Sequence, residues 1–210
     1  MKKFEGYESA RVNGDYEKIE LGPHICKILE VKVEEITTKE GRTFEQLILK
    51  IDMDSKDKQP GYYSKKFQSD ATTNALNAKW KGYYKLSIPE DGSEDYIKAN
   101  FKTLITSVEQ SNPGYVWNWE ENTLVGKKFC GVFGIEEFKN DKGDVIAFTR
   151  CRYIRSTENM DKIEIPKVIL ADKTKIDYEE YMNNKAQKKD NNTSTTTEEV
   201  ATLDSDDLPF

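Results

Sequence analysis

The stretch HICKILEVKVEEITTKEGRTFEQLILKIDMD, residues 24–54, sets the fold that the sequence predicts. In its first half, Leu29, Val31 and Val33 alternate with charged residues, which is the period-2 pattern of a strand with one buried face. The segment KEGR (39–42) is typical of a turn. The second half alternates again, and its expected inner face holds Leu47, Leu49, Ile51 and Met53. Residues 24–54 therefore predict a β-hairpin.

The two strands of this hairpin differ in regularity. The first changes phase at Ile28 and Leu29, and a β-bulge at that point would explain the slip. The second keeps its phase throughout, so its outer face is expected to carry Ile48, Lys50 and Asp52.

The sequence that follows predicts further strands around one helix. YYSKKFQ (62–68) and KWKGYYKLSI (79–88) are aromatic, basic and short enough to be strands. SEDYIKANFKTLITSVEQSN (93–112) has apolar residues at helical spacing, from Tyr96 and Ile97 onward, and Ser93 in the position of an N-cap. A second hairpin is expected from KKFCGVFGIEEF (127–138), the turn NDKG and DVIAFTRCRYIRS (144–156).

This order of elements, with one helix between the third and fourth strands, is that of an OB-fold, a small five-stranded Greek-key barrel. An α+β sheet covered by one helix would produce the same order. We expect an N-terminal arm (1–21), an all-β OB-fold core (22–156), and a peripheral extension with a strand and a short helix (157–182). Residues 183–210 contain few apolar side chains and are expected to form a disordered tail.

Charge is unevenly distributed along the chain, whose net charge is −6. The residues from Asp190 onward include no base, and their acids are Asp190, Glu198, Glu199, Asp204, Asp206 and Asp207. The rest of the chain is neutral as a whole. Within it, residues 58–89 combine six lysines with a single acid, Asp70, and with several aromatic residues. The acidic net charge therefore does not exclude nucleic acid as a ligand.

Residues 58–89 match what a protein needs in order to bind an unpaired strand, because bases stack on rings and phosphates attract cations. The candidate stacking rings are Tyr62, Tyr63, Phe67, Trp80, Tyr83 and Tyr84. The candidate phosphate contacts are Lys65, Lys66, Lys79, Lys81 and Lys85. The last strand adds four further candidate nucleic-acid-binding residues, the ring of Phe148 and the cations Arg150, Arg152 and Arg155. In the alternative interpretation, half of these rings fill the barrel and the lysines form a solvated rim.

Three other groups of residues are interpreted as structural. Trp117 and Trp119 lie beside Glu120 and Glu121, whose charges would repel phosphate, so both rings are expected to close the helix onto the sheet. The three cysteines, Cys26, Cys130 and Cys151, lie in strand-like runs and are expected to be buried free thiols. His24, the only histidine, is expected to pack or cap at the start of a strand.

Catalysis is not expected, and neither is a cofactor. No phosphate-binding glycine loop precedes a helix. A metal-dependent nuclease built on Asp52, Asp54 and Glu136 is the enzymatic alternative, although such sites need three or more converging carboxylates. The chain opens without a signal peptide, so a cytoplasmic protein is expected.

The ending LDSDDLPF (203–210) places an apolar anchor and a terminal carboxylate behind a polar tether. A tether of about 25 residues spans roughly 25–30 Å, so its tip could search for a partner around the body. The candidate partner-binding residues are Asp206, Asp207, Leu208, Pro209 and Phe210.

This tip resembles the acidic tip of bacterial and phage single-stranded DNA-binding proteins. The segments GPHICKILEV (22–31), GYYSKKF (61–67), EQSNPGYVWNWEE (109–121) and LVGKKFCGVFGIEEF (124–138) resemble the single-stranded DNA-binding proteins of phages and integrative elements. The resemblance implies an OB-fold that binds single-stranded DNA in replication, recombination or repair. It also implies that the tip recruits partners such as a helicase, primase, polymerase loader or recombinase. The short strand with which bacterial members open is absent, so their tetramer is not implied, and a homo-oligomer stays open. A strand-annealing accessory factor is the alternative among binding proteins.

Overall fold

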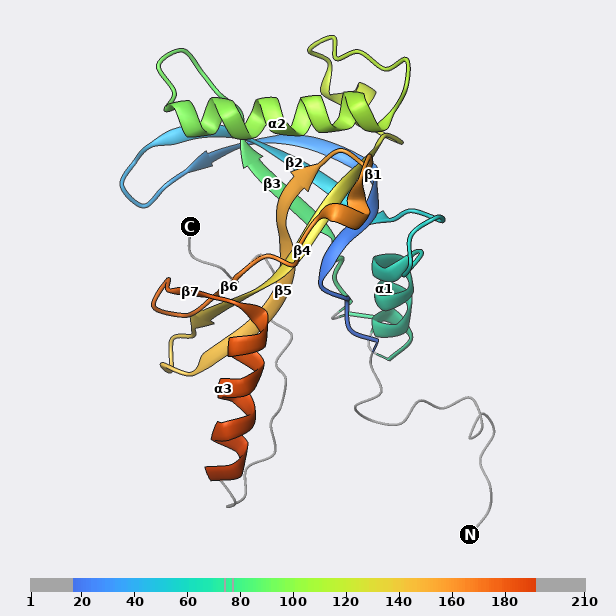
Figure 1. Cartoon of the computed structure of the whole chain (residues 1–210). Coiled ribbons are helices and arrows are strands. Elements are labelled where there is room, and N and C mark those ends of the chain that lie inside the picture. The colour runs from blue at the N-terminus through green and yellow to red at the C-terminus, as the bar shows by residue number, and fades with distance from the viewer. Residues whose placement is uncertain (1–16, 74, 77, 192–210) are drawn as a thin grey trace.

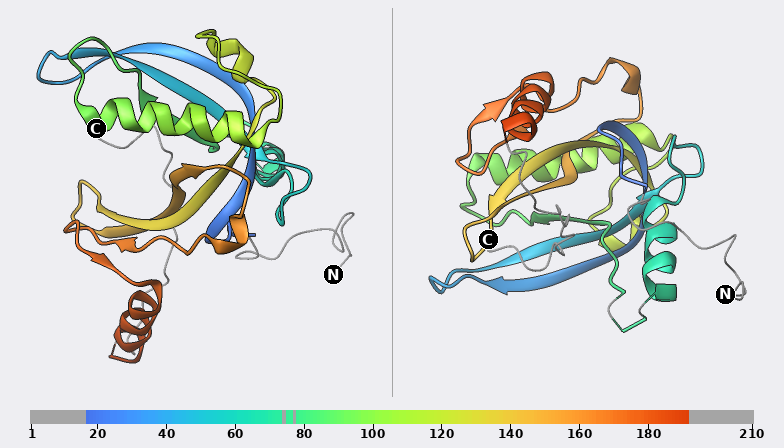
Figure 2. Two further views of the ribbon diagram at one scale, coloured as in Figure 1. Left: turned by 45° about the horizontal axis from the view of Figure 1, so that its top comes forward. Right: turned by 90° about the horizontal axis from the view of Figure 1, so that it is seen from below.

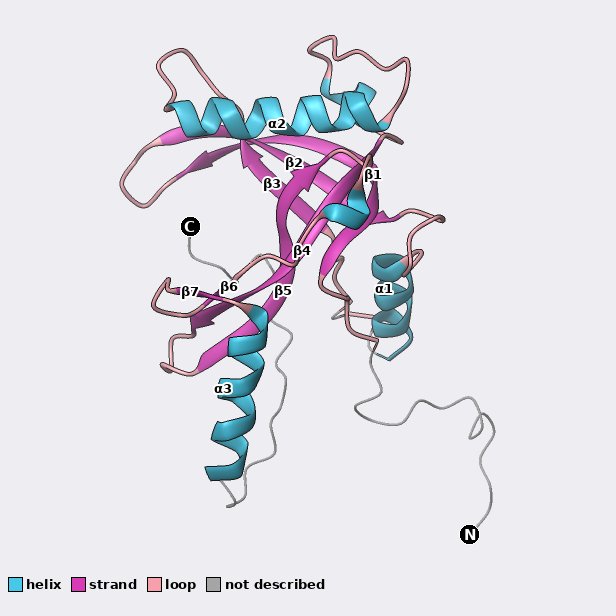
Figure 3. Ribbon diagram, viewed as in Figure 1, coloured by secondary structure: helices cyan, strands magenta, loops and turns pink. Residues whose placement is uncertain are grey.

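The computed structural model describes residues 17–73, 75–76 and 78–191 of the chain. Its seven strands are β1 (Gly22–Thr37), β2 (Thr43–Met53), β3 (Tyr83–Ser87), β4 (Lys128–Lys139), β5 (Val145–Arg155), β6 (Val168–Ile169) and β7 (Lys175–Ile176). The helices are α1 (Tyr62–Thr73), α2 (Asp95–Ser111) and α3 (Tyr178–Asn191), with short 3₁₀ turns η2 (Glu121–Leu124) and η3 (Met160–Lys162). The expectation of a mostly β protein is confirmed (Figure 3).

Strands β1 and β2 form the predicted hairpin. Val31 pairs with Leu49 and Cys26 with Met53, and the inner face of β2 is the one that the alternation predicts. The register shifts between Ile28 and Glu30, which confirms the bulge. Leu29, the extra residue, is exposed rather than buried, and so is Val33 toward the tip of the hairpin.

The sheet is open. β1 pairs with β2 on one edge and with β4 on the other, β3 adds to β2, and β5 adds to β4. β6 makes one parallel bridge to β4, at Glu136, and continues into β7. The expected five-stranded barrel is not closed, because within the described residues β3 and β5 do not pair. The β1–β2 and β4–β5 hairpins both extend to the same side of the molecule, and their tips diverge from each other (Figures 1 and 2).

The helix expected between the third and fourth strands is α2, and it covers one end of the sheet (Figure 1). Phe101, Leu104, Ile105 and Val108 bury its inner face in the core. Its start differs from the prediction, because Glu94 holds the N-cap position without a side-chain cap. Ser93 instead accepts a hydrogen bond from the backbone N–H of Glu90 at 2.7 Å. Tyr96 is 60 % exposed and lies outside the core.

The segment 62–68, expected as a strand, begins helix α1 instead. The side chain of Asp52 explains the difference, because it accepts hydrogen bonds from the backbone N–H groups of Tyr63 and Ser64 and from the hydroxyl of Ser64. The first N–H groups of a helix have no partner within the helix. Asp52 supplies this partner from a strand that ends before the helix begins.

The C-terminal extension contains β6, β7 and α3. Val168 and Ile169 are buried, and Tyr181 is the buried side chain at the start of α3, which then points away from the body (Figure 1). Helix α3 continues to Asn191 and so includes residues 183–191, which were expected to lack regular structure. Across the described part of the chain, each helix is too short or too polar to span a membrane.

Candidate nucleic-acid interface

Alternating side chains of β1, β2 and β3 point away from the core and form a face that combines cations with a ring. The strand register places Lys32, Ile48 and Lys85 in one row across the three strands. The next row holds Glu30, Lys50 and Tyr83. Their neighbours Leu47, Leu49, Tyr84 and Leu86 point into the core. Ile48 is only 8 % exposed, although the alternation predicts it on the exposed side of its strand. We call the side chains of Lys32, Lys50, Tyr83 and Lys85 the outer face.

Trp80 extends this face at the start of β3. The ammonium of Lys50 lies 5.0 Å from the centre of its ring, and the ring of Phe67 on α1 lies 5.9 Å away. The indole N–H of Trp80 donates to the carbonyl of Gly82 at 3.1 Å. The ring is half-buried, because one side packs against the core. Helix α1 and the segment before strand β3 thus bring two of the predicted rings together beside Lys50.

Glu30 lies among the lysines of the outer face. Its carboxylate is 3.4 Å from the ammonium of Lys32 and 3.4 Å from that of Lys50. The hydrogen bond and charge of Lys32, together with those of Lys50, hold the pKa of Glu30 below its ordinary value. Glu30 therefore stays ionised near neutral pH, and its negative charge partly offsets the attraction of Lys32 and Lys50 for an anion such as phosphate.

The structure corrects the assignment of three predicted stacking rings, because Tyr62, Tyr63 and Tyr84 all pack against the core. Tyr62 and Tyr63 are buried in the first turn of α1, and burial raises the pKa of both hydroxyls. Tyr84 lies on the inner face of β3, and burial raises its pKa to about 12. Tyr62 and Tyr63 are therefore too buried to stack on a base, and Tyr84 is half-buried with its ring against the core.

The predicted cations of residues 58–89 are distributed over two elements. Lys65 and Lys66 lie on α1, and Lys66 forms an ion pair of 4.0 Å with Asp70 one turn later. Lys79 and Lys81 flank Trp80, and only Lys85 belongs to a strand of the outer face. The helical geometry of 62–68 therefore separates Lys65 and Lys66 from the register that aligns the other cations.

Strand β5 places its predicted residues next to a carboxylate. Arg150 and Arg152 lie 3.4 Å and 3.7 Å from one oxygen of Glu136, and Lys173 lies 3.7 Å from the other. Phe148 pairs across the strands with Glu136. The side chain of Arg152 is only 12 % exposed, so its main role is structural.

Arg155, the last predicted residue of β5, is exposed. Its guanidinium lies 5.7 Å from the ring of Tyr153 and donates to the carbonyl of Ile154 at 2.8 Å.

Lys32 and Lys50 are not among the candidate phosphate contacts predicted from the sequence. The signal was present, since the alternation of 44–54 places Lys50 opposite the buried Leu49 and Ile51. Alternation shows which side of its own strand Lys50 lies on, but it does not show which residues of the neighbouring strands lie beside it. Only the strand register gives those neighbours.

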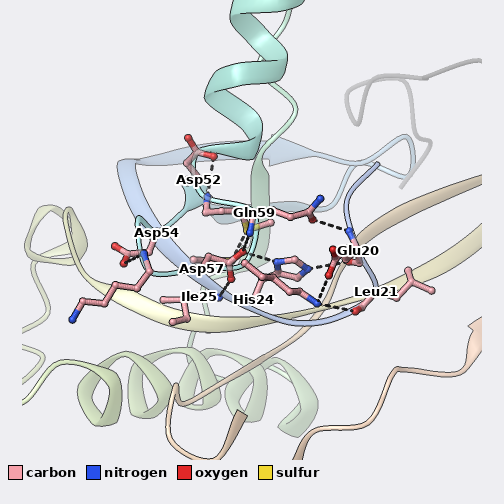
Figure 4. Close-up of polar contacts among 12 residues, drawn as sticks. Glu20, Leu21, His24, Ile25, Asp52, Asp54, Asp57 and Gln59 are labelled. Atoms are coloured by element: carbon pink, nitrogen blue, oxygen red, sulfur yellow. Dashed lines mark hydrogen bonds and ion pairs between the residues drawn. The ribbon is translucent and has the colours of Figure 1, made fainter. Parts of the chain in front are cut away.

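The residues considered for catalysis hold the structure together (Figure 4). His24 is fully buried, with Nδ1 2.9 Å from Asp57 and Nε2 3.0 Å from the carbonyl of Glu20. Asp57 also accepts hydrogen bonds from the backbone N–H groups of Ile25 and Gln59. These contacts fasten the loop after β2 to the start of β1.

The carboxylates of the nuclease alternative also have other partners. Asp52 caps α1, Asp54 is 3.0 Å from the ammonium of Lys128, and Glu136 faces three cations. Within residues 17–73, 75–76 and 78–191, no three His, Cys, Asp or Glu side chains gather as a metal site requires.

The three cysteines are buried free thiols, as predicted. Burial raises the pKa of Cys151 to about 12 and that of Cys130 to about 11. Such thiols stay protonated and are poor nucleophiles at neutral pH.

Comparisons with known proteins identify no relative: no family model matches the chain, and no curated protein matches it. The predicted partner-binding residues Asp206, Asp207, Leu208, Pro209 and Phe210 lie outside the described residues.

Proposed function

We propose that this protein binds single-stranded DNA on the outer face and has no catalytic activity of its own. The observation that carries the proposal is the register, which aligns Lys32, Lys50 and Lys85 beside Tyr83, with Trp80 adjoining. Rings interleaved with cations suit an unpaired strand, because each stacked base contributes about 1–3 kcal/mol and every base has a flat face.

The proposed fold is an OB-fold whose barrel is open along one seam. In the strand order β3-β2-β1-β4, with β5 beyond β4, the edges of β3 and β5 are the two that would meet in a closed barrel. Tyr84 of β3 packs against the same core to which Cys151 and Ile154 of β5 belong, so the two edge strands border one core. OB-folds are partly open barrels that bind oligonucleotides on strands 2 and 3.

Titration of a fluorescently labelled dT oligomer at several salt concentrations tests the function. We expect binding that weakens as salt increases, with a slope of about 0.7 per phosphate contacted. The double variant Lys32→Gln, Lys50→Gln should bind several-fold more weakly and with a shallower slope, and Tyr83→Ala should weaken binding at every salt concentration.

The matched control is Lys98→Gln, Lys102→Gln, which removes the same charge from the exposed side of α2. The control should bind within about twofold of the wild type, because non-specific attraction depends on nearby charge. Absence of binding in dilute buffer would refute the function. Equal losses in the two double variants would refute the outer face as its site.

A further inference from the structure

A tryptophan is held in solvent at the end of the molecule where α2 ends. Trp119 is 79 % exposed and Val116 is 76 % exposed, and both belong to the segment between α2 and η2. The sequence predicts that Trp119 closes the helix onto the sheet, and this prediction is wrong. Only Trp117 does so, with its ring centre 6.4 Å from that of Phe101 on α2.

The segment that presents Trp119 is held by hydrogen bonds. The backbone N–H of Trp117 donates to the carboxylate of Glu109 at 2.9 Å, and the hydroxyl of Tyr115 lies 2.8 Å from that of Thr123. The side chain of Asn112 bonds to both the N–H and the carbonyl of Lys128, which ties the segment to β4. A ring fixed on such a segment loses little conformational entropy when it binds.

The backbone at Trp119 is also strained. Its φ is +68°, a region that a bulky residue rarely adopts and that costs about 1–3 kcal/mol. The ring gives little in return within the chain, since its main neighbour is Trp117 with ring centres 6.3 Å apart. Strain of this kind is concentrated at ligand-binding sites.

The charge around Trp119 indicates what it can bind. Between residues 103 and 126 the sequence has three acids, Glu109, Glu120 and Glu121, and no lysine or arginine. The ammonium of Lys127 lies 4.5 Å from the ring centre of Tyr115, so one cation borders the segment and the acids outnumber it. Phosphates of DNA would be repelled, and so would the acidic residues after Asp190. A symmetric pair of copies would place the same acids against each other, which is also unfavourable. A cationic protein surface would be attracted.

We propose that Trp119 and Val116 form a docking surface for a partner protein that has an apolar pocket bordered by lysine or arginine. The ring fills the pocket, and Glu120 and Glu121 pair with the basic border. Buried tryptophans are among the residues that contribute most to protein interfaces. The segment between α2 and η2 lies at the opposite end of the molecule from α3 (Figure 1). This inference does not depend on DNA binding.

The test begins with p-benzoylphenylalanine in place of Trp119 in the full-length chain, produced and irradiated in the cells that make the protein. A protein cross-linked through position 119 is identified, purified and titrated with the wild type, Trp119→Gly and Glu120→Gln, Glu121→Gln. We expect Trp119→Gly to raise the Kd about tenfold or more. The Glu120→Gln, Glu121→Gln variant should raise the Kd by a smaller factor and make the Kd less dependent on salt. Leu76→Ala, which removes another exposed apolar side chain, is the control and should bind normally.

Glycine is chosen at position 119 because it adopts a positive φ freely. Trp119→Gly should therefore melt at the same temperature as the wild type or above it, whereas a purely structural tryptophan would lower the melting temperature when removed. Cross-links only to DNA, only to a second copy or to nothing would overturn the proposal. So would a captured protein that binds Trp119→Gly as tightly as it binds the wild type.

Discussion

Asp57 holds together the start of the sheet and the loop after β2. Burial alone would raise the pKa of this carboxyl, but hydrogen bonds from His24, Gln59 and Ile25 outweigh burial and hold its pKa below the ordinary value of 3.8. A carboxylate with a lowered pKa stabilises the folded state at pH values above its unfolded pKa. That contribution is lost as the pH falls through the lower pKa of the folded state.

We therefore expect Asp57→Asn to be destabilised at pH 7 by about 1–3 kcal/mol, because buried N–H groups lose a charged acceptor. The difference from the wild type should shrink below pH 4. Urea unfolding at several pH values measures it, and Asp141→Asn, in the exposed turn between β4 and β5, is the control. A difference that stayed constant down to pH 2 would show that ionisation of Asp57 does not stabilise the fold.

Gly82 is required by close packing rather than by a special backbone angle. A Cβ at this position would lie 2.4 Å from the carbonyl oxygen of Ile51 and 2.6 Å from the ring of Tyr63. Backbone cannot move aside as the end of a flexible side chain can. We expect Gly82→Ala to lower the free energy of unfolding by about 1–3 kcal/mol or more in a denaturant titration.

Gly134 provides the comparison for Gly82. A Cβ there would meet only side-chain atoms, the nearest being Pro166 at 3.0 Å. Gly134→Ala should therefore be the milder of the two substitutions, and the reverse order would contradict the packing around β3.

At the scale of elements, α1 depends on a residue outside itself. Asp52 closes strand β2 and caps α1 through the N–H groups of Tyr63 and Ser64. Asp52→Ala should cost about 1–2 kcal/mol, the range of a lost N-cap, and should reduce helical circular dichroism. Because Phe67 on α1 lies against Trp80, the environment of Trp80 should change, and the tryptophan emission with it.

Asp54→Ala is the control for the cap. Asp54 is two residues away but pairs with Lys128, so its loss should leave the helical signal unchanged. An equal loss of helical signal in both variants would mean that the end of β2 as a whole, rather than the cap, determines α1.

At the scale of the whole molecule, the acidic residues after Asp190 and the outer face carry opposite charge. If the tip recruits replication or recombination proteins, deletion of residues 201–210 should abolish that recruitment. The deletion should leave the affinity for oligo-dT equal or higher, because an anionic segment competes with phosphate for cations. Anisotropy titrations of the truncated and full-length chains measure this, and weaker DNA binding after truncation would contradict it.

The sequence by itself determined the elements whose evidence is local. Alternation in 24–54 predicts both strands, the inner face of the second strand and the bulge near Leu29, because side chains in a strand alternate between its faces. The apolar spacing of 93–112 predicts α2, and the turns predict the second hairpin. The burial of the cysteines also followed from their apolar neighbours.

Only the tertiary structure decided the features that depend on contacts between distant residues. The cap from Asp52 makes 62–68 a helix and buries Tyr62 and Tyr63, although their own sequence is compatible with a strand. The register across three strands aligns Lys32, Lys50 and Lys85, and the packing of Trp117 on Phe101 leaves Trp119 in solvent. Local preferences are worth tenths of a kcal/mol per residue, so a buried charged cap or a packed ring outweighs them.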